Sequence, residues 1–427
     1  MRYILSLTAL LWVLPTSAQV NFETYFFDRT MRFDFYHAGN NQHECYYFDA
    51  LKAEPYWAGS KQSLIDTTNL GNQFFRIVDI ADEREIYSRG YCTLFNEWQD
   101  TPEALTTSRA YPESVIFPYP KRPCRIELYS RNSEGKFALL FSQDIDPESY
   151  WIEQFRPRYE SFDVVYHGAP DRRVDIVVLP EGYSADERSK FEEACQRFAE
   201  AMFAYAPYDT LKERFNIRAV WAPSEESGVT IPGEHIWRNT ACEANFYTFD
   251  SERYQTVADQ QRLRDLAAHV PYEYIYVLSN TQKYGGGGIF NFYGISAEHN
   301  PGFTGKIYIH EFGHLLMGLG DEYVGTTAYD DTMYDKRLEP WEPNLTTLVD
   351  FDQKAIWKGL LKANTPIPTP ATEAYRTEVG VYEGGGYAAK GIYRPSQQCL
   401  MNSFRGVEEF CPVCQEAIRS YIDFLCR

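Results

Sequence analysis

The chain has 427 residues, of which 44% are hydrophobic and 24% charged, values typical of a globular protein. With 60 acidic side chains against 41 basic ones, its formal net charge is −19 at pH 7. Such a chain offers no basic stripe for a phosphate backbone, so the composition argues against nucleic acid as a partner. The aromatic content of 16% favours β-rich folds and recognition surfaces.

The N-terminus is typical of an export signal. Arg2 supplies a positive charge, residues 4–14 form a short apolar run, and small residues lead to Ala18. The run is shorter than the roughly 20 residues that span a bilayer, and no cysteine stands directly after the expected cleavage point, where a lipid anchor would require one. We therefore expect residues 1–18 to be a signal peptide. The mature chain, starting near Gln19, would be secreted, periplasmic or at the cell surface, with no membrane span.

Nine cysteines follow the predicted cleavage point. Export permits disulfide bonds, and an odd count leaves at least one thiol free. Cys411 and Cys414 are separated by two residues, a spacing that occurs in redox and zinc sites. Because no second pair stands at zinc-finger spacing, we favour a structural role for these two cysteines.

Residues 19–165 are predicted to form an all-β sandwich domain. Stretches rich in strand-forming residues recur, separated by Gly, Asn, Asp and Pro. The predicted strands lie at 22–26, 74–80, 125–129 and 136–141. The Asn-Ser-Glu-Gly run at 132–135 is predicted to be the turn of a hairpin. No catalytic motif is visible in this part of the chain.

Residues 166–427 are predicted to form a second domain, of the α/β type. The apolar run 173–180 is typical of a buried strand. Ser184 and Glu187 form a capping box that opens a helix running to about Tyr205. Two further strands are expected near 215–221 and 272–278.

The chemistry is carried by the segment His-Glu-Phe-Gly-His at 310–314. Histidines four apart on a helix lie on one face, about 6 Å apart along its axis, so His310 and His314 can reach one metal ion. Glu311 is rotated by about 100° and can reach a water in the open fourth position. Zinc lowers the pKa of that water to about 7, and the carboxylate takes its proton. The alternative, a helix whose histidines only pack, is disfavoured because the apolar residues 315–317 bury it where unpaired polar groups are costly.

The third ligand is predicted from the glycines that follow. If the helix continued, Asp321 would lie about 10 Å beyond His314 along the axis. Gly318 and Gly320 can adopt the left-handed conformation that ends a helix, which would bring Asp321 under the metal. Glu322 is the second choice, and it could instead orient a ligating histidine. A glutamate from a later helix is a rival geometry, but residues 330–380 offer no strong candidate.

This segment resembles the IgA-peptidase family of zinc metallopeptidases, which is metzincin-like. The resemblance implies one catalytic Zn²⁺ bound by His310, His314 and Asp321. Ordinary metzincins have their glycine and third ligand one residue earlier than this chain. The segment 393–402 resembles the metzincin methionine turn, which implies that Met401 lies beneath the zinc, with an ordinary core methionine as the alternative. The implied fold is a metzincin-like α+β or α/β domain preceded by the β-sandwich.

Substrate contacts are predicted on two glycine-rich segments. In metzincin-like enzymes, an edge strand just before the zinc helix pairs with extended substrate, and residues 285–293, which begin with four glycines, occupy that place. Glycines there would let a peptide backbone approach closely, although a flexible loop is the alternative. The loop 381–387 is also rich in glycine and aromatic residues. Tyr387 or Tyr393 could donate a hydrogen bond to the oxyanion of the tetrahedral intermediate, unless both only pack.

Two functions compete on the sequence. The first is an endopeptidase with protein or peptide substrates, among which immunoglobulin A, dietary, mucin and host-matrix proteins are equally open. The second is a non-catalytic surface or glycan-binding protein whose zinc is structural or lost. A structural zinc needs a fourth protein ligand, and no further His or Cys stands next to the motif, which favours the peptidase.

Overall fold

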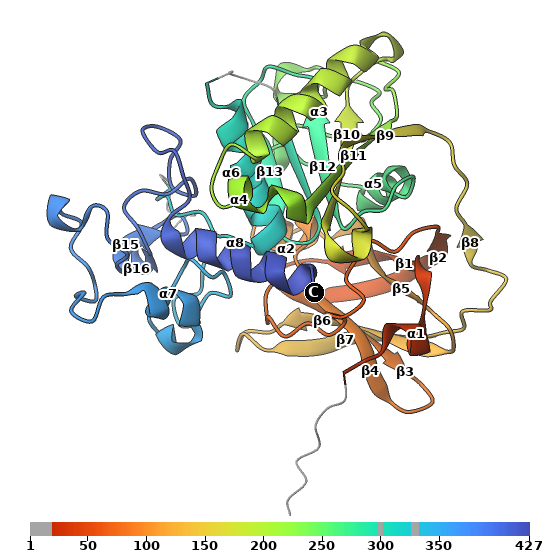
Figure 1. Ribbon diagram of the computed structural model, residues 1–427, viewed down its shortest axis with the longest axis horizontal. Coiled ribbons are helices and arrows are strands. Elements are labelled where there is room, and N and C mark those ends of the chain that lie inside the picture. The colour runs from red at the N-terminus through yellow and green to blue at the C-terminus, as the bar shows by residue number, and fades with distance from the viewer. Residues whose placement is uncertain (1–18, 298–301, 326–332) are drawn as a thin grey trace, which may run out of the picture.

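A computed structural model describes residues 19–297, 302–325 and 333–427, and the predicted signal peptide 1–18 lies outside them. Figure 1 shows a β-rich N-terminal part, in red and orange, packed below a mixed α/β part in green and teal. The C-terminal segments, in blue, extend to one side. Within the described residues, no helix combines the length and apolarity needed to cross a membrane.

The N-terminal part contains two four-stranded sheets, with strand orders β5-β1-β2-β8 and β4-β3-β6-β7. Phe33 and Phe35 of the first sheet share one buried cluster with Ile77 and Ile126 of the second. The strands are β1 (Phe26–Gly39), β2 (Glu44–Glu54), β3 (Gln73–Asp79), β4 (Arg84–Tyr91), β5 (Arg109–Pro120), β6 (Cys124–Arg131), β7 (Phe137–Ile145) and β8 (Glu153–Gln154).

Three of the four predicted strands in this part are confirmed as β3, β6 and β7. The predicted turn joins β6 to β7, where Gly135 adopts a φ of 73° and its N–H donates to Asn132 O at 2.9 Å. The strand predicted at 22–26 is wrong, because Phe22–Tyr25 forms the short helix α1. The Asn21 side chain accepts the Thr24 N–H at 2.9 Å, a local cap that competes with extended structure.

A six-stranded sheet forms the centre of the second part, in the order β13-β14-β12-β10-β11-β9. Four neighbouring strands run parallel, while the two edge strands are antiparallel to their neighbours. The four inner strands are buried along their whole length, as expected for a sheet covered on both faces. The strands are β9 (Glu160–Val165), β10 (Val174–Glu181), β11 (Phe215–Trp221), β12 (Tyr274–Ser279), β13 (Gly286–Ile289) and β14 (Tyr293–Ala297). The predicted strands 173–180, 215–221 and 272–278 are thereby confirmed.

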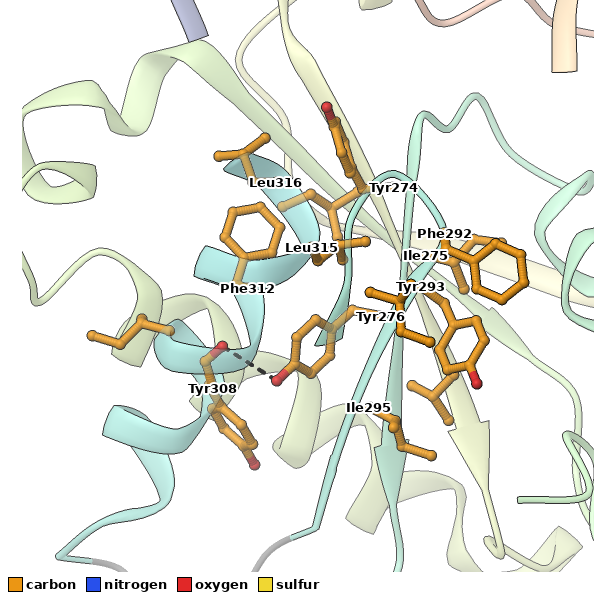
Figure 2. Close-up of a cluster of buried hydrophobic side chains, with 14 of the residues drawn as sticks. Tyr274, Ile275, Tyr276, Phe292, Tyr293, Ile295, Tyr308, Phe312, Leu315 and Leu316 are labelled. Atoms are coloured by element: carbon orange, nitrogen blue, oxygen red, sulfur yellow. Dashed lines mark hydrogen bonds between the residues drawn. The ribbon is translucent and has the colours of Figure 1, made fainter. Parts of the chain in front are cut away.

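Helices cover this sheet. The predicted capping box is present at Ser184 and Glu187, but the helix that it opens ends at Met202, earlier than expected. Figure 2 shows side chains of α6, among them Phe312 and Leu315, packed against the tyrosines of β12. The helices are α2 (Leu94–Gln99), α3 (Arg188–Met202), α4 (Tyr208–Leu211), α5 (Gln260–Ala267), α6 (Thr304–Met317), α7 (Ala355–Leu360) and α8 (Pro412–Leu425). A hairpin of β15 (Tyr382–Gly385) and β16 (Ala388–Arg394) lies beyond α7 in the chain.

The two parts share buried side chains. Phe95, Trp98 and Tyr111 of the N-terminal part belong to the same hydrophobic cluster as the inner strands and α6. The Cys92 N–H donates to Phe290 O at 2.9 Å, which links β4's end to the loop after β13. The protein is therefore a mixed α/β structure in which the β-rich region supports the part that carries the histidines.

Candidate active site

Helix α6 ends where the chain must turn to bring the predicted third ligand back. Its C-cap is Gly318, whose φ of 62° is the left-handed conformation that was expected. Gly320, predicted to take the same conformation, does not adopt it. A Cβ at Gly320 would lie 2.4 Å from Leu345 Cδ1, so glycine is required there for close packing. A single left-handed glycine is enough to reverse the chain.

The structure brings His310, His314 and Asp321 together. The Nε2 atoms of the two histidines are 3.2 Å apart. Asp321 Oδ1 lies 3.3 Å from His310 Nε2 and 3.4 Å from His314 Nε2. A tetrahedral ion with bonds of 2.0–2.1 Å holds its ligand atoms about 3.3–3.4 Å apart. The spacing of these three atoms therefore fits a small divalent metal such as zinc.

Hydrogen bonds fix which nitrogen of each ring faces the centre of this group. His310 Nδ1 lies 3.0 Å from Leu400 O, and His314 Nδ1 lies 2.5 Å from Leu319 O. A carbonyl oxygen only accepts, so each Nδ1 carries a hydrogen and each Nε2 is left to bind a metal. Asp321 Oδ1 is buried and makes no hydrogen bond within the described part of the chain. Three electron-rich atoms that converge without a donor between them need a cation.

The pKa shifts of His314 and Asp321 in the metal-free site also indicate that a positive charge is required there. Burial acts to lower the pKa of His314, but the Asp321 carboxylate outweighs it and raises that pKa to about 9. Burial acts to raise the pKa of Asp321, but the two histidines hold it far below its usual range. Without a metal, a proton on His314 takes part of the place that a cation would fill.

Zinc binding is expected to strengthen as the pH rises from 7 to 9. In this range the metal-free chain carries a proton on His314 that the metal must displace, whereas Asp321 stays ionised. The affinity should rise about tenfold per pH unit and level off above about pH 9. Competition with a chromophoric chelator at several pH values measures this slope. A flat profile between pH 7 and 9 would contradict the assignment of His314.

Glu311 lies on the face of α6 that packs against β13. Its Oε1 atom is 3.0 Å from the position that a Cβ on Gly286 would occupy, and its carbonyl oxygen is 2.2 Å from the position of a Cβ on Gly288. Burial raises the pKa of Glu311, while the two histidines act to lower it. A buried carboxylate with a raised pKa is a stronger proton acceptor than an exposed one, which suits a general base.

Strand β13 is the edge strand that the sequence predicts before α6. The glycines of this strand were expected to let a substrate backbone approach, but in the structure they allow close contact with other parts of the protein. Gly286 and Gly288 pack against α6, and Gly287 packs against Tyr254. The outer edge is also partly occupied, since the Gly286 N–H donates to Arg253 O at 3.3 Å and its carbonyl accepts from Gln255 at 3.3 Å.

Tyr387 reaches the site through Asp321. Its hydroxyl donates to Asp321 Oδ2, and Tyr323 donates to the same oxygen at 2.9 Å. The two tyrosine rings are 5.0 Å apart and nearly perpendicular. Tyr393 lies in β16, where its backbone pairs with Thr346 and its ring packs against the main core. Of the two predicted tyrosines, the structure brings only Tyr387 to the metal-type group by a hydrogen bond within the described residues.

Met401 lies beneath α6. It is fully buried, and its Sδ atom is 3.4 Å from the position of a Cβ on Gly313. Its carbonyl oxygen accepts the Glu322 N–H at 2.7 Å, and the preceding carbonyl, of Leu400, accepts from His310. The turn around Met401 thus contacts both the helix that carries the histidines and the segment that carries Asp321.

Comparison with protein families gives matches over most of the chain. The model described as IgA Peptidase M64 matches residues 163–378 and 371–422, and the model described as Peptidase M64 N-terminus matches residues 21–142. The chain belongs to the IgA peptidase M64 family. This membership supports a peptidase and agrees with the resemblance seen in the motif. No curated protein matches the chain.

The second-choice ligand of this M64 chain, Glu322, points away from the histidines. Its Oε1 accepts from Asn344 Nδ2 at 3.0 Å and from Cys414 Sγ at 3.3 Å. The Asn344 side chain also makes two hydrogen bonds of 2.8 Å with the backbone of Gly320: its Oδ1 accepts the Gly320 N–H, and its Nδ2 donates to the Gly320 carbonyl. The side chains of these adjacent residues therefore belong to different clusters: Asp321 lies with the two histidines, and Glu322 lies with Cys414.

No sequence motif predicts the contribution of the M64 N-terminal region to this site. Glu97 of α2 accepts a hydrogen bond from the hydroxyl of Tyr254, the residue against which Gly287 packs. Burial raises the pKa of Glu97 to about 7, and the charges of His314 and Asp321 also act on it. Glu97 and Tyr254 are 157 residues apart in the chain, so only the folded structure brings them together.

Proposed function

We propose that the protein is a secreted zinc-dependent endopeptidase that hydrolyses extracellular proteins. The observation that carries this proposal is the convergence of His310, His314 and Asp321, at the spacing of a tetrahedral ion, beside the carboxylate of Glu311. Three protein ligands leave a fourth position open, as in catalytic rather than structural zinc sites. Membership of the M64 family supports the peptidase activity.

When bound, zinc supplies a water whose pKa is about 7 and polarises the carbonyl of the scissile bond. Glu311 accepts the proton of the attacking water and then donates it to the leaving amine. Its carboxylate lies beside Gly286 of β13, so the packing of α6 on that strand restricts the positions that the side chain can take. His310 and His314 are held by the carbonyls of Leu400 and Leu319, which keep each Nε2 directed at the metal.

We propose that extended substrate pairs with the outer edge of β13 at Gly288. Gly285 O accepts from Ala297 of β14 at 3.1 Å, whereas the N–H and C=O of Gly286 point to the opposite edge. Backbone groups alternate between the two sides of a strand, so those of Gly288 point outward as those of Gly286 do. A peptide strand added there would lie next to the helix that carries Glu311.

Tyr387→Phe is expected to weaken zinc binding about 10–100-fold, because the hydroxyl orients the ligand Asp321. At saturating zinc the variant should recover its kcat. Zinc titration and steady-state kinetics measure the two effects separately, and Tyr393→Phe is the matched control. A kcat that stays low at saturating zinc would instead support the hydrogen bond to the oxyanion expected from the sequence.

The experiment that tests the proposed function is cleavage of casein and of a peptide library by the purified protein. We expect cleavage that a strong chelator abolishes and added zinc restores. Zinc bound at the histidines without cleavage of any library would favour the non-catalytic surface or glycan-binding protein. A metal-independent cleavage would exclude the mechanism altogether.

The proposal includes the organisation expected from the sequence. Residues 1–18 would direct export, 19–165 would form the sandwich domain, and 166–427 would form the metzincin-like catalytic domain. Packing of one buried cluster between the two N-terminal sheets supports the sandwich. Mass spectrometry of the exported protein tests the first point, since it should begin near Gln19.

A further inference from the structure

A second group of metal-type side chains lies behind the histidine site. It comprises Glu322, Cys399, Cys411 and Cys414, all buried, with one potential ligand atom from each lying within 4.8 Å of every other. The four residues come from three segments: the turn after α6, the turn around Met401 and the start of α8. The sequence drew attention only to Cys411 and Cys414 and offered no second pair of cysteines beside them.

The distances within this group are those of a shared ion and not of a disulfide bond. Cys399 Sγ lies 3.8 Å from Cys414 Sγ, whereas bonded sulfurs are about 2.0 Å apart. A tetrahedral zinc with Zn–S bonds of about 2.3 Å holds its sulfurs about 3.8 Å apart. Cys414 Sγ also lies 3.3 Å from Glu322 Oε1. None of the nine cysteines of the chain is in a disulfide bond.

The surroundings of the group fit metal-bound thiolates and carboxylate. The Cys411 N–H donates to Cys399 Sγ at 3.3 Å, a contact that stabilises a charged sulfur. Asn344 Nδ2 donates to Glu322 Oε1 and fixes the orientation of the carboxylate. Glu322 Oε2 is buried without a hydrogen-bond partner within the described residues. Three thiols and a carboxyl group buried together carry a desolvation cost that a divalent cation would offset.

We propose that Cys399, Cys411, Cys414 and Glu322 bind a second, structural zinc ion. Four protein ligands close the coordination sphere, which distinguishes this site from the open site at the histidines. Thiolate ligands select zinc over hard cations such as calcium or magnesium. This site does not depend on peptidase activity, and it would exist in an inactive protein as well.

The consequence of this site is mechanical support for the catalytic residues. Glu322 follows Asp321 directly, and Cys399 precedes Leu400 and Met401, whose carbonyls bind His310 and Glu322. Cys411 and Cys414 belong to the start of α8, which Figure 1 shows beside α6. One ion would therefore tie the third ligand, the turn around Met401 and the C-terminal helix together.

Metal analysis of a chain without the histidine site tests the proposal. The full-length wild-type protein should hold about two zinc ions and His310→Ala about one. Adding Cys411→Ser and Cys414→Ser to His310→Ala should remove the remaining zinc. The matched control adds Cys195→Ser, which changes a cysteine buried in α3 outside the group and should leave about one zinc bound.

X-ray absorption at the zinc edge of His310→Ala keeps the test decisive if the cysteine variants do not fold. We expect a first shell dominated by Zn–S bonds of about 2.3 Å. Cobalt loading should add a thiolate-to-cobalt charge-transfer band. A shell of nitrogen and oxygen alone, or a peptide map with two of the three cysteines in a disulfide bond, would overturn the proposal. Sulfur-bound zinc in a protein that cleaves nothing would uphold this site while contradicting the proposed peptidase.

Discussion

Replacing Glu311 by glutamine is expected to leave the zinc content unchanged and to lower kcat by about 10²–10⁴-fold. Glutamine has the same shape, so it can occupy the place of the carboxylate beside Gly286 without moving α6 away from β13. The ligands His310 and His314 keep their hydrogen bonds to backbone carbonyls, so metal binding does not depend on Glu311. Only the ability to accept a proton is lost, and that ability is specific to the chemical step.

The measurement combines metal analysis with kinetics on the same preparation of Glu311→Gln. Glu200→Gln is the matched control, because Glu200 is exposed on α3 and is remote in sequence from the motif. Its kcat should equal that of the wild type. Substantial turnover by Glu311→Gln at full zinc content would mean that another group takes the proton, and the mechanism would have to be rebuilt around that group.

The residues that share one helix could be predicted from the sequence. The spacing of His310, Glu311 and His314 has a fixed meaning on a helix, because its rise and rotation per residue are constant. The end of that helix was also predictable, since Gly318 is the residue type that adopts the left-handed conformation most easily. Beyond Gly318 the local rules stop, and the choice between Asp321 and Glu322 stayed open on the sequence alone. In the structure their side chains diverge toward two different groups of ligands.

Contacts between distant segments could not be predicted in the same way. The group of Glu322, Cys399, Cys411 and Cys414 joins three segments, and a spacing rule that considers Cys411 and Cys414 alone cannot find it. The glycines of β13 were correctly placed on an edge strand. Glycine is needed there because α6 approaches the strand closely, and that approach depends on tertiary packing. The strand predicted at 22–26 failed for the opposite reason: a local cap at Asn21 outweighs the strand preference of the aromatic residues around it.

His314→Ala is expected to remove the catalytic zinc and with it all measurable peptidase activity. The loss takes away one of three protein ligands, and Asp321 loses one of the two histidines whose positive charge balances it in the metal-free chain. Asp321 keeps His310 and two tyrosine hydroxyls as partners, but a buried carboxylate with less compensating charge is less stable, so the metal-free variant should also unfold more easily than the metal-free wild type. Zinc cannot offset this cost by binding to the remaining two ligands at the concentrations that saturate the wild type.

The thermal midpoint separates these effects on the same protein. Added zinc should raise the Tm of the chelator-treated wild type and leave that of His314→Ala unchanged at concentrations near the wild-type Kd, because only a ligand that binds the native state stabilises it. Zinc held by the cysteine group would appear as a constant background in both proteins and would not respond to this substitution. If His314→Ala instead kept the full wild-type zinc content and its Tm response, the ion would not lie between His310 and Asp321. The spacing of 3.2–3.4 Å among the three atoms would then need another explanation.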